Sequence, residues 1–288
     1  MGFRTVIVSS RAKLEFRLNF MIVRCEKERR FYIDEINTLI IQNTAVALTS
    51  ALLSELIKRN IKVIFCDEKH NPSSELVPYY GAHNTSKRYK IQMSWQQDTK
   101  DNIWQKIVNQ KITNQARHLE KRGFIEESNL LKSYLPEILS GDTTNREGHA
   151  AKVYFNCILE EGVSRKDGGF TNGCLNYGYT ILLSAFNREI VASGYLTQLG
   201  IWHDNPFNRF NLSSDLMEPL RPLVDETALN LPPDTKEFKK EMVDILNKQI
   251  KIGDITTTLD FAIEIYIKSV FRALENNDVN EIVFPCYE

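Results

Sequence analysis

The strongest constraint on the fold of this chain is a change in the spacing of its apolar residues near residue 70. Before this point, short runs rich in Val, Ile, Phe and Thr follow the two-residue period of β-strands. The predicted strands are residues 5–9, 13–17, 20–24, 29–32, 38–42 and 62–67. Beyond it, long segments follow the 3.6-residue period of helices. The sequence therefore predicts two regions of different architecture.

Two local signals refine the first region. Leu18-Asn19 joins two predicted strands and is expected to form a hairpin turn. Residues 49–59 break the strand pattern, and Thr49 or Ser50 can cap a helix there. The apolar residues of this segment fall on one helical face: Leu52, Leu53, Leu56 and Ile57. A small β-domain with one helix is predicted.

The segment after the strands carries two prolines, a glycine and several turn-forming residues, as expected for a linker. We therefore predict an α+β chain: a β-rich domain over residues 1–72, a linker over 73–86, and a larger all-α domain over 87–288. Two apolar stripes carry the helical prediction: Ile103, Trp104, Ile107, Ile112 and Ala116, and Leu259, Ala262, Ile263, Tyr266, Val270 and Leu274.

Composition excludes several classes of protein. With 42% hydrophobic and 25% charged residues, the chain is typical of folded globular proteins rather than disordered or fibrous ones. No stretch approaches 18 uninterrupted apolar residues, so no membrane span is expected. The first residues lack a secretory signal, and the five scattered cysteines form no CxxC pair. A cytoplasmic protein with reduced thiols is expected.

Charge is balanced overall, with 36 basic and 37 acidic residues, but it is uneven along the chain. Residues 84–123 contain nine Lys or Arg against three acids. One interpretation is a solvated helix face. The other is a stripe that binds nucleic-acid phosphates, in which Lys87, Arg88 and Lys90 make contacts. Charge alone leaves both interpretations open.

Two acidic motifs are candidates for chemistry. Glu147 follows Thr144 and Asn145, either of which can cap a helix, so its carboxylate can simply complement a helix dipole. Asp215 and Glu218 share a helical face within an apolar run, where unpaired carboxylates are costly. Arg221, three residues after Glu218, can supply the missing partner. A divalent metal held by Glu147, His203 and Glu218 would meet the same need, and these ligand types suit Mg²⁺ or Mn²⁺.

At these motifs the sequence resembles CRISPR-associated protein one, the integrase that installs new spacers in prokaryotic immunity. Residues 145–151 (NREGHAA) are similar to the glutamate motif of that family, and His203 with 214–222 (SDLMEPLRP) and Asp225 is similar to its histidine and acidic motifs. The type II branch is resembled most, through MGFRTVIV at 1–8, VIFCD at 63–67 and NYGY at 176–179.

The resemblance implies a β-rich domain that forms a homodimer and a helical catalytic domain. It implies that Glu147, His203 and Glu218 bind Mg²⁺ or Mn²⁺ and that Asp215 supports them. Many relatives have Asp where this chain has Glu218, and the loop 204–212 lacks a common Arg-Pro-Gly sequence. Besides the stripe residues, Arg146 and Tyr177 are predicted DNA contacts.

The implied reaction joins a DNA 3′-hydroxyl to the CRISPR repeat by metal-dependent phosphoryl transfer. Double-stranded DNA with 3′-hydroxyl ends, the repeat DNA, a small CRISPR-associated protein two that bridges two dimers, and other type II adaptation proteins are the implied partners. Two alternatives stay open: a structure-selective endonuclease with the same site, and a non-catalytic DNA-binding scaffold. The acidic tail 275–288 either docks a partner or folds onto its own domain.

Overall fold

The computed structural model describes residues 2, 4–79, 82, 84–160 and 162–287. The chain divides into an amino-terminal unit, Met1–Gly81, and a carboxyl-terminal unit, Ala82–Glu288. This division falls inside the segment expected to be a linker. That segment is not all irregular, because strand β8 (Pro72–Glu75) extends into its beginning and helix α2 (Thr85–Met93) starts within its end.

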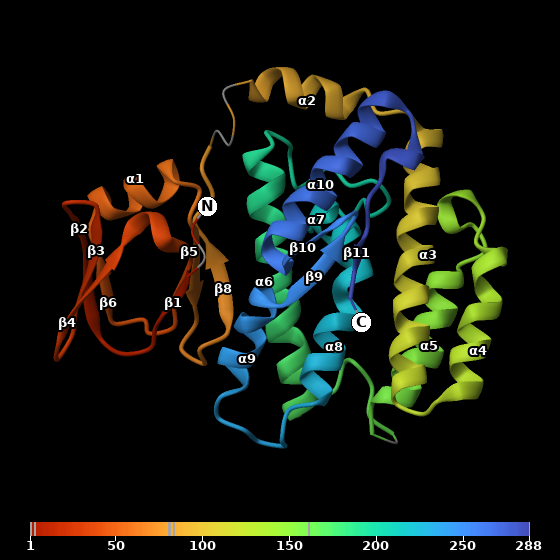
Figure 1. Ribbon diagram of the computed structural model, residues 1–288, viewed down its shortest axis with the longest axis horizontal. Helices are drawn as coiled ribbons and strands as arrows, with labels where there is room; N and C mark the ends of the chain where they lie inside the picture. Colours follow the sequence, from red (N-terminus) through yellow and green to blue (C-terminus); the bar gives the residue numbers. More distant parts are fainter. Residues whose placement is uncertain (1, 3, 80–81, 83, 161, 288) are drawn as a thin grey trace. The chain divides into compact units, whose positions relative to one another are not determined.

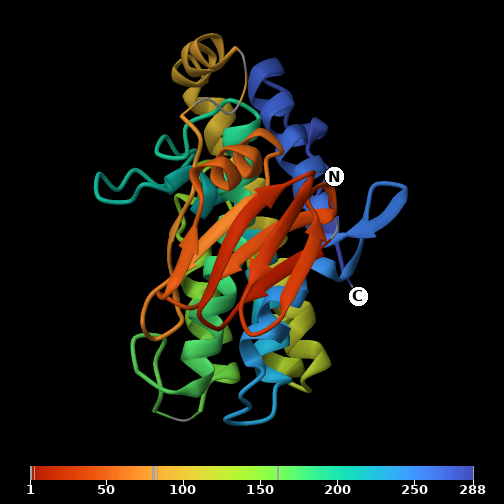
Figure 2. The same cartoon turned by 90° about the vertical axis from the view of Figure 1, so that its left-hand side faces the viewer.

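Two four-stranded sheets make up the amino-terminal unit, whose strands are drawn in red and orange in Figure 2. One sheet has the order β1 (Arg4–Val8), β5 (Ile36–Ile41), β7 (Lys62–Cys66) and β8; the other has the order β4 (Glu28–Tyr32), β3 (Phe20–Arg24), β2 (Ala12–Arg17) and β6 (Val46–Leu48). A short 3-10 helix, η1 (Ile33–Glu35), precedes β5. Apolar residues of both sheets form one buried core with Leu52 and Leu56 of α1 (Ser50–Lys58).

The local signals of this unit are confirmed. Leu18 and Asn19 both have positive φ, 50° and 64°, and they connect Arg17 to its partner Phe20 in the β2–β3 hairpin. This two-residue turn matches the right-handed twist of the paired strands. Of the two possible caps for α1, Thr49 is the one whose side chain accepts a hydrogen bond, from the backbone N–H of Leu52. All six predicted strands and the helix are present, while β6 and β8 were not predicted.

The carboxyl-terminal unit is mostly helical (Figure 1). Helices α3, α4 and α5 pack side by side, and α6 packs against α7, α8, α9 and α10. Both predicted apolar stripes are buried, one on α3 and one on α10. None of the described helices is long and apolar enough to cross a membrane. The bounds are α3 (Gln97–Lys121), α4 (Ile125–Tyr134), η2 (Leu135–Glu137), η3 (Ser140–Asp142), α5 (Arg146–Ile158), α6 (Phe170–Ala192), α7 (Asn211–Met217), η4 (Glu218–Leu220), α8 (Arg221–Leu229), α9 (Phe238–Asp244), η5 (Ile245–Asn247), α10 (Leu259–Asn276) and η6 (Val279–Glu281).

The prediction of an all-α second domain is wrong in one place. A three-stranded sheet with the order β10 (Ile255–Thr258), β9 (Gln249–Ile252) and β11 (Pro285–Cys286) lies in this unit. Its strands are too short and too polar to stand out by periodicity. The acidic tail folds onto its own unit, because β11 pairs with β9 and the carbonyl of Tyr287 accepts a hydrogen bond from Arg117.

Candidate active site

A buried lysine joins two acids that are far apart in the sequence. The ammonium group of Lys111, in the middle of α3, forms ion pairs with Glu147 at the start of α5 and with Glu218 at the start of η4. The side chains of Lys111 and Glu218 are each only 7% exposed. Burial lowers the pKa of Lys111, but the attraction of the two carboxylates outweighs this effect and the pKa is raised. Lys111 is therefore charged in this site.

Glu218 has a second cationic partner. The Nε atom of Arg221 lies 2.9 Å from Oε1 of Glu218, in the i, i+3 pairing that the sequence offered. Burial raises the pKa of the Glu218 carboxyl, and the positive charges of Arg221 and Lys111 more than reverse this, so the pKa is lowered. Oε2 of Glu218 is buried and has no hydrogen bond of good geometry, although the Lys111 ammonium is nearby. The Lys111 ammonium is therefore the cation paired with this oxygen.

His203 is held in a single orientation by Asp215. The fully buried carboxylate of Asp215 accepts hydrogen bonds from the backbone N–H groups of Ile201, Trp202 and His203, and it lies 2.5 Å from Nδ1 of His203. The hydrogen bond to Asp215 raises the pKa of His203 despite partial burial. Because Nδ1 faces Asp215, Nε2 is the nitrogen left to bind an ion or a substrate. Asp215 itself has both oxygens occupied.

This turn around Asp215 requires a glycine. A Cβ atom on Gly200 would lie 2.3 Å from the carbonyl oxygen of His203 and 2.8 Å from Oδ2 of Asp215. Both distances are shorter than real Cβ atoms tolerate. The close approach of backbone and carboxylate therefore depends on the absence of a side chain at this position.

The start of α5 positions Glu147, but the predicted capping residues are wrong. Asn145 makes no capping hydrogen bond, and Thr144 donates instead to the carbonyl of Glu137. The cap is Asp142, whose two oxygens accept from the backbone N–H groups of Arg146 and Glu147, each at 2.9 Å. A carboxylate can satisfy two of the unpaired N–H groups of a helix start at once. Asp142 thus fixes the backbone that carries Glu147.

The expected metal ligands are only partly assembled. Among the described residues, no group of three His, Cys, Asp or Glu side chains has the spacing of a metal site. Glu147 and Glu218 meet through Lys111, whereas His203 acts on Glu218 only through its charge. The donor types nevertheless fit Mg²⁺ or Mn²⁺, because two carboxylates already share one cation and a buried Glu218 oxygen lacks a hydrogen bond. Lys111 occupies the position between the acids.

Comparison with known proteins identifies the family. The family model described as CRISPR associated protein Cas1 matches residues 5–252. The chain belongs to the Cas1 family. It is 30% identical to the CRISPR-associated endonuclease Cas1 of Neisseria meningitidis, over 99% of this chain and 96% of that protein. It is 26% identical to a CRISPR-associated endonuclease Cas1 of Francisella tularensis, over 83% of this chain and 81% of the relative.

Solved structures show the same Cas1 fold. A casposase bound to integration product has a TM-score of 0.75 at 17% identity, over 96% of this chain and 91% of the casposase chain. A Cas1 protein from Thermotoga maritima has a TM-score of 0.72 at 17% identity, over 99% of this chain and all of the other. At these identities the likeness concerns the fold alone.

A buried polar network lies beside the acids of this Cas1-family chain. Tyr154 and Tyr179 both donate to Asp225, and the guanidinium of Arg221 lies 4.8 Å from the centre of the Tyr179 ring. His118 contacts the hydroxyl of Tyr154 at 2.6 Å. Burial raises the pKa of Asp225 to about 6, even though the tyrosine hydrogen bonds and Arg221 oppose the effect. Through Tyr179, the network contacts Arg221, the arginine that pairs with Glu218.

The predicted DNA contacts of the Cas1-family chain have different surroundings. Lys87 and Lys90 are exposed on α2, and no ion pair involves them within the part of the chain that the structure describes. Arg88 forms an ion pair with Glu275 and a 3.0 Å hydrogen bond to Tyr195. Arg146 pairs with Glu137 at 2.6 Å. Tyr177 is 2% exposed, so its ring offers no face to DNA in this conformation.

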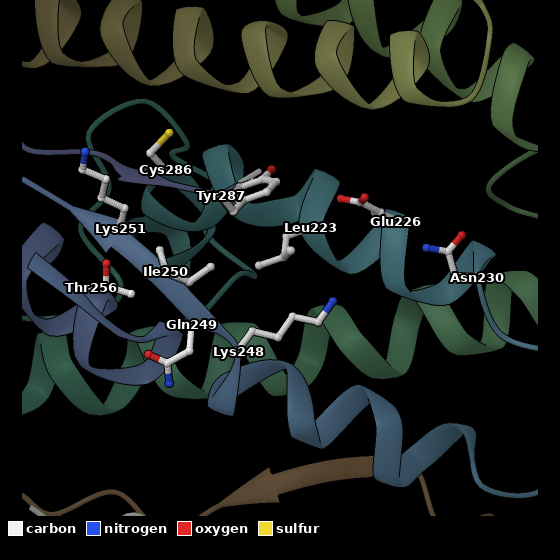
Figure 3. Close-up of a pocket in the computed structure, with 10 residues that line it drawn as sticks. All are labelled: Leu223, Glu226, Asn230, Lys248, Gln249, Ile250, Lys251, Thr256, Cys286 and Tyr287. Carbon is white, nitrogen blue, oxygen red and sulfur yellow. The ribbon is translucent and has the colours of Figure 1, made fainter.

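A separate cavity of about 460 Å³ lies between α8, β9, β10 and the chain end of this Cas1-family protein (Figure 3). Its lining mixes apolar, basic and acidic side chains, including Leu223, Lys248 and Glu226. The lining contains none of the residues predicted to bind metal. The cavity is therefore distinct from the cluster around Lys111.

Proposed function

We propose that this chain is a metal-dependent DNA integrase of spacer acquisition, which joins 3′-hydroxyl ends of DNA fragments to the CRISPR repeat. The observation that carries the proposal is the convergence of two glutamates, the partly exposed Glu147 and the buried Glu218, on one buried cation. Membership of the Cas1 family supports it. So does the common fold with a casposase bound to integration product.

In the proposed reaction the fragment's 3′-oxygen forms a bond to a repeat phosphorus and gives up its proton to solvent. The phosphorus–oxygen bond to the adjoining strand end breaks, and that oxygen leaves as a hydroxyl after it takes up a proton. Mg²⁺ or Mn²⁺ held by Glu147, His203 and Glu218 would supply positive charge against the phosphoryl transition state. Asp215 fixes His203 so that Nε2 faces away from the Asp215 carboxylate. Arg221 keeps Glu218 ionised and in place.

Endonuclease activity is the second candidate, because the relatives carry that name and water can replace the 3′-hydroxyl at the same site. One assay separates the candidates: a labelled duplex with 3′-hydroxyl ends and a supercoiled repeat plasmid are incubated with and without Mn²⁺. Metal-dependent transfer of label into the plasmid supports the integrase, whereas nicking without transfer supports the endonuclease. Binding with neither product would support a non-catalytic scaffold and overturn the proposal.

The proposed assembly is a homodimer formed through the amino-terminal unit, with two dimers bridged by a Cas2 protein and bound to double-stranded DNA. A similar fold occurs within a Cas6-RT-Cas1–Cas2 complex, at 18% identity and a TM-score of 0.74, over 97% of this chain and 36% of that one. Other type II adaptation proteins are further proposed partners. Light scattering tests the dimer, since a monomeric mass at every concentration would contradict it. Adding the Cas2 protein is expected to increase joining strongly.

A further inference from the structure

We propose that Lys111 is a built-in competitor of the divalent cation: its ammonium group occupies the place between Glu147 and Glu218, and a metal ion enters only when Lys111 leaves. This inference rests on the proposed function for the identity of the site. It adds that metal affinity is set by a residue that is not a metal ligand. Lys111 thereby tunes the concentration of metal at which the site fills.

The contacts of Lys111 support this exclusion. One ammonium group touches carboxylates from two different elements, α5 and η4, in a buried environment. Arg221 approaches Oε1 of Glu218, so the Oε2 side is the one that faces Lys111. A metal ion shared by both glutamates would compete with Lys111 for these two carboxylates. Two cations cannot occupy that space together.

Charge balance leads to the same conclusion. Glu147 and Glu218 carry two negative charges, and Lys111 and Arg221 balance them with two positive charges. A divalent ion added to this set would leave an excess of positive charge in a buried place, which is costly. Displacement of Lys111 reduces the excess. A lysine is suited to this exchange because its ammonium is a compact charge on a flexible stem.

The test measures Mn²⁺ binding rather than catalysis. Titration of the full-length protein with Mn²⁺ alone, followed by calorimetry or by the EPR signal of free Mn²⁺, compares wild type with Lys111→Met. We expect Lys111→Met to bind Mn²⁺ at least about tenfold more tightly, because the competing charge is gone. Lys106→Met is the matched control on the same helix, because the Lys106 ammonium contacts Asn280 rather than a carboxylate. Its affinity should equal that of wild type.

Three further measurements make the outcome decisive. Adding Glu218→Gln to Lys111→Met should abolish the gain, which locates the ion at this site. Lys111→Gln removes the charge but keeps a hydrogen-bond donor, so it serves if Lys111→Met does not fold, and the same tighter binding is expected. In EDTA the melting temperature of Lys111→Met should fall below that of wild type, and Mn²⁺ should raise it more.

Equal or weaker Mn²⁺ binding in both neutral variants would overturn the inference. Such a result would leave the integrase proposal standing, because joining by wild type is measured separately. Conversely, if the neutral Lys111 variants bind Mn²⁺ more tightly but wild type joins no DNA, the integrase proposal alone is contradicted.

Discussion

Two charge clusters in the carboxyl-terminal unit contain similar residues but have different roles. In the site cluster (Lys111, Glu147, Glu218 and Arg221), one ammonium group is shared by two carboxylates. In the brace cluster (Arg188, Glu189 and Asp260), Arg188 uses Nε for Glu189 at 2.7 Å and Nη2 for Asp260 at 2.6 Å. A guanidinium gives each acid its own nitrogen. The brace cluster therefore ties α6 to α10, whereas the site cluster holds a cation that another can replace.

The largest expected effect tests whether the acids of the site cluster take part in strand joining or only stabilise the fold. Glu218→Gln should reduce strand joining by at least about 1,000-fold while DNA affinity stays nearly constant, because a ligand charge is lost but the exposed lysines remain. Asp215→Asn should reduce joining less, by about 10- to 100-fold, because Asp215 orients His203. Joining across a Mn²⁺ titration, with binding measured in parallel, checks both.

If Glu218→Gln stays active and Asp215→Asn is inactive, the roles are reversed: Asp215 is the metal ligand and Glu218 the supporting acid. Full activity of both variants would place the metal site elsewhere in the chain.

A second test breaks the brace cluster. Arg188→Met leaves Glu189 and Asp260 buried without this partner, so we expect the free energy of unfolding to fall by about 3–5 kcal/mol. Mn²⁺ should not restore it, in contrast to Lys111→Met. Denaturant unfolding measures both effects. Arg272→Met, which removes an exposed arginine paired with Glu281, is the control and should cost less than about 1 kcal/mol.

A third test concerns the carboxyl that backs the site cluster. The pKa of Asp225 is about 6 in the folded chain and 3.8 for a free side chain, so the folded state binds the proton more tightly. Stability from this group is fully present below pH 4 and is lost as the pH rises through 6, by about 3 kcal/mol. Asp225→Asn removes this dependence.

The stability of Asp225→Asn relative to wild type should therefore rise by about 3 kcal/mol between pH 4 and pH 7. Unfolding curves at intermediate pH values provide the measurement, and a constant difference would show that the Asp225 pKa is ordinary.

The smallest expected effect concerns exposed lysines that belong to neither cluster. Lys87→Ala with Lys90→Ala should make the slope of log K for DNA against log salt shallower by about 2, since each phosphate contact releases a counterion. Arg88→Ala should change the slope less, because Arg88 already pairs with Glu275. An unchanged slope in the double variant would mean that the two lysines form only a solvated face.

Most of the fold could be predicted because the apolar residues of each main strand or helix follow the period of that element. The strands β1–β5 and β7, and the buried faces of α3 and α10, carry clear apolar spacing. The strands β6, β8 and β9–β11 are two to four residues long, and β8 reads Pro-Ser-Ser-Glu. A segment this short gives no periodicity, so its pairing depends on neighbours far away in the sequence.

The site was predictable where its contacts are local. Arg221 was expected as a partner of Glu218 because three helical positions separate them. Lys111 was missed, because it lies 36 residues from Glu147 and looked like one more charge in a basic run. Asp142 was missed as the cap of α5 because its carboxylate reaches past the expected capping position. Tertiary packing brings Lys111 to Glu147, whereas Asp142 is a local cap in an unexpected position.

The crowding around Gly200 has a consequence for how this gene can drift. Any amino acid that replaces this glycine adds the Cβ atom for which the His203 carbonyl and the Asp215 carboxylate leave no room. Such variants would distort the loop that holds His203. We therefore expect glycine at this position in functional descendants of the chain, even though Gly200 takes no part in any chemistry.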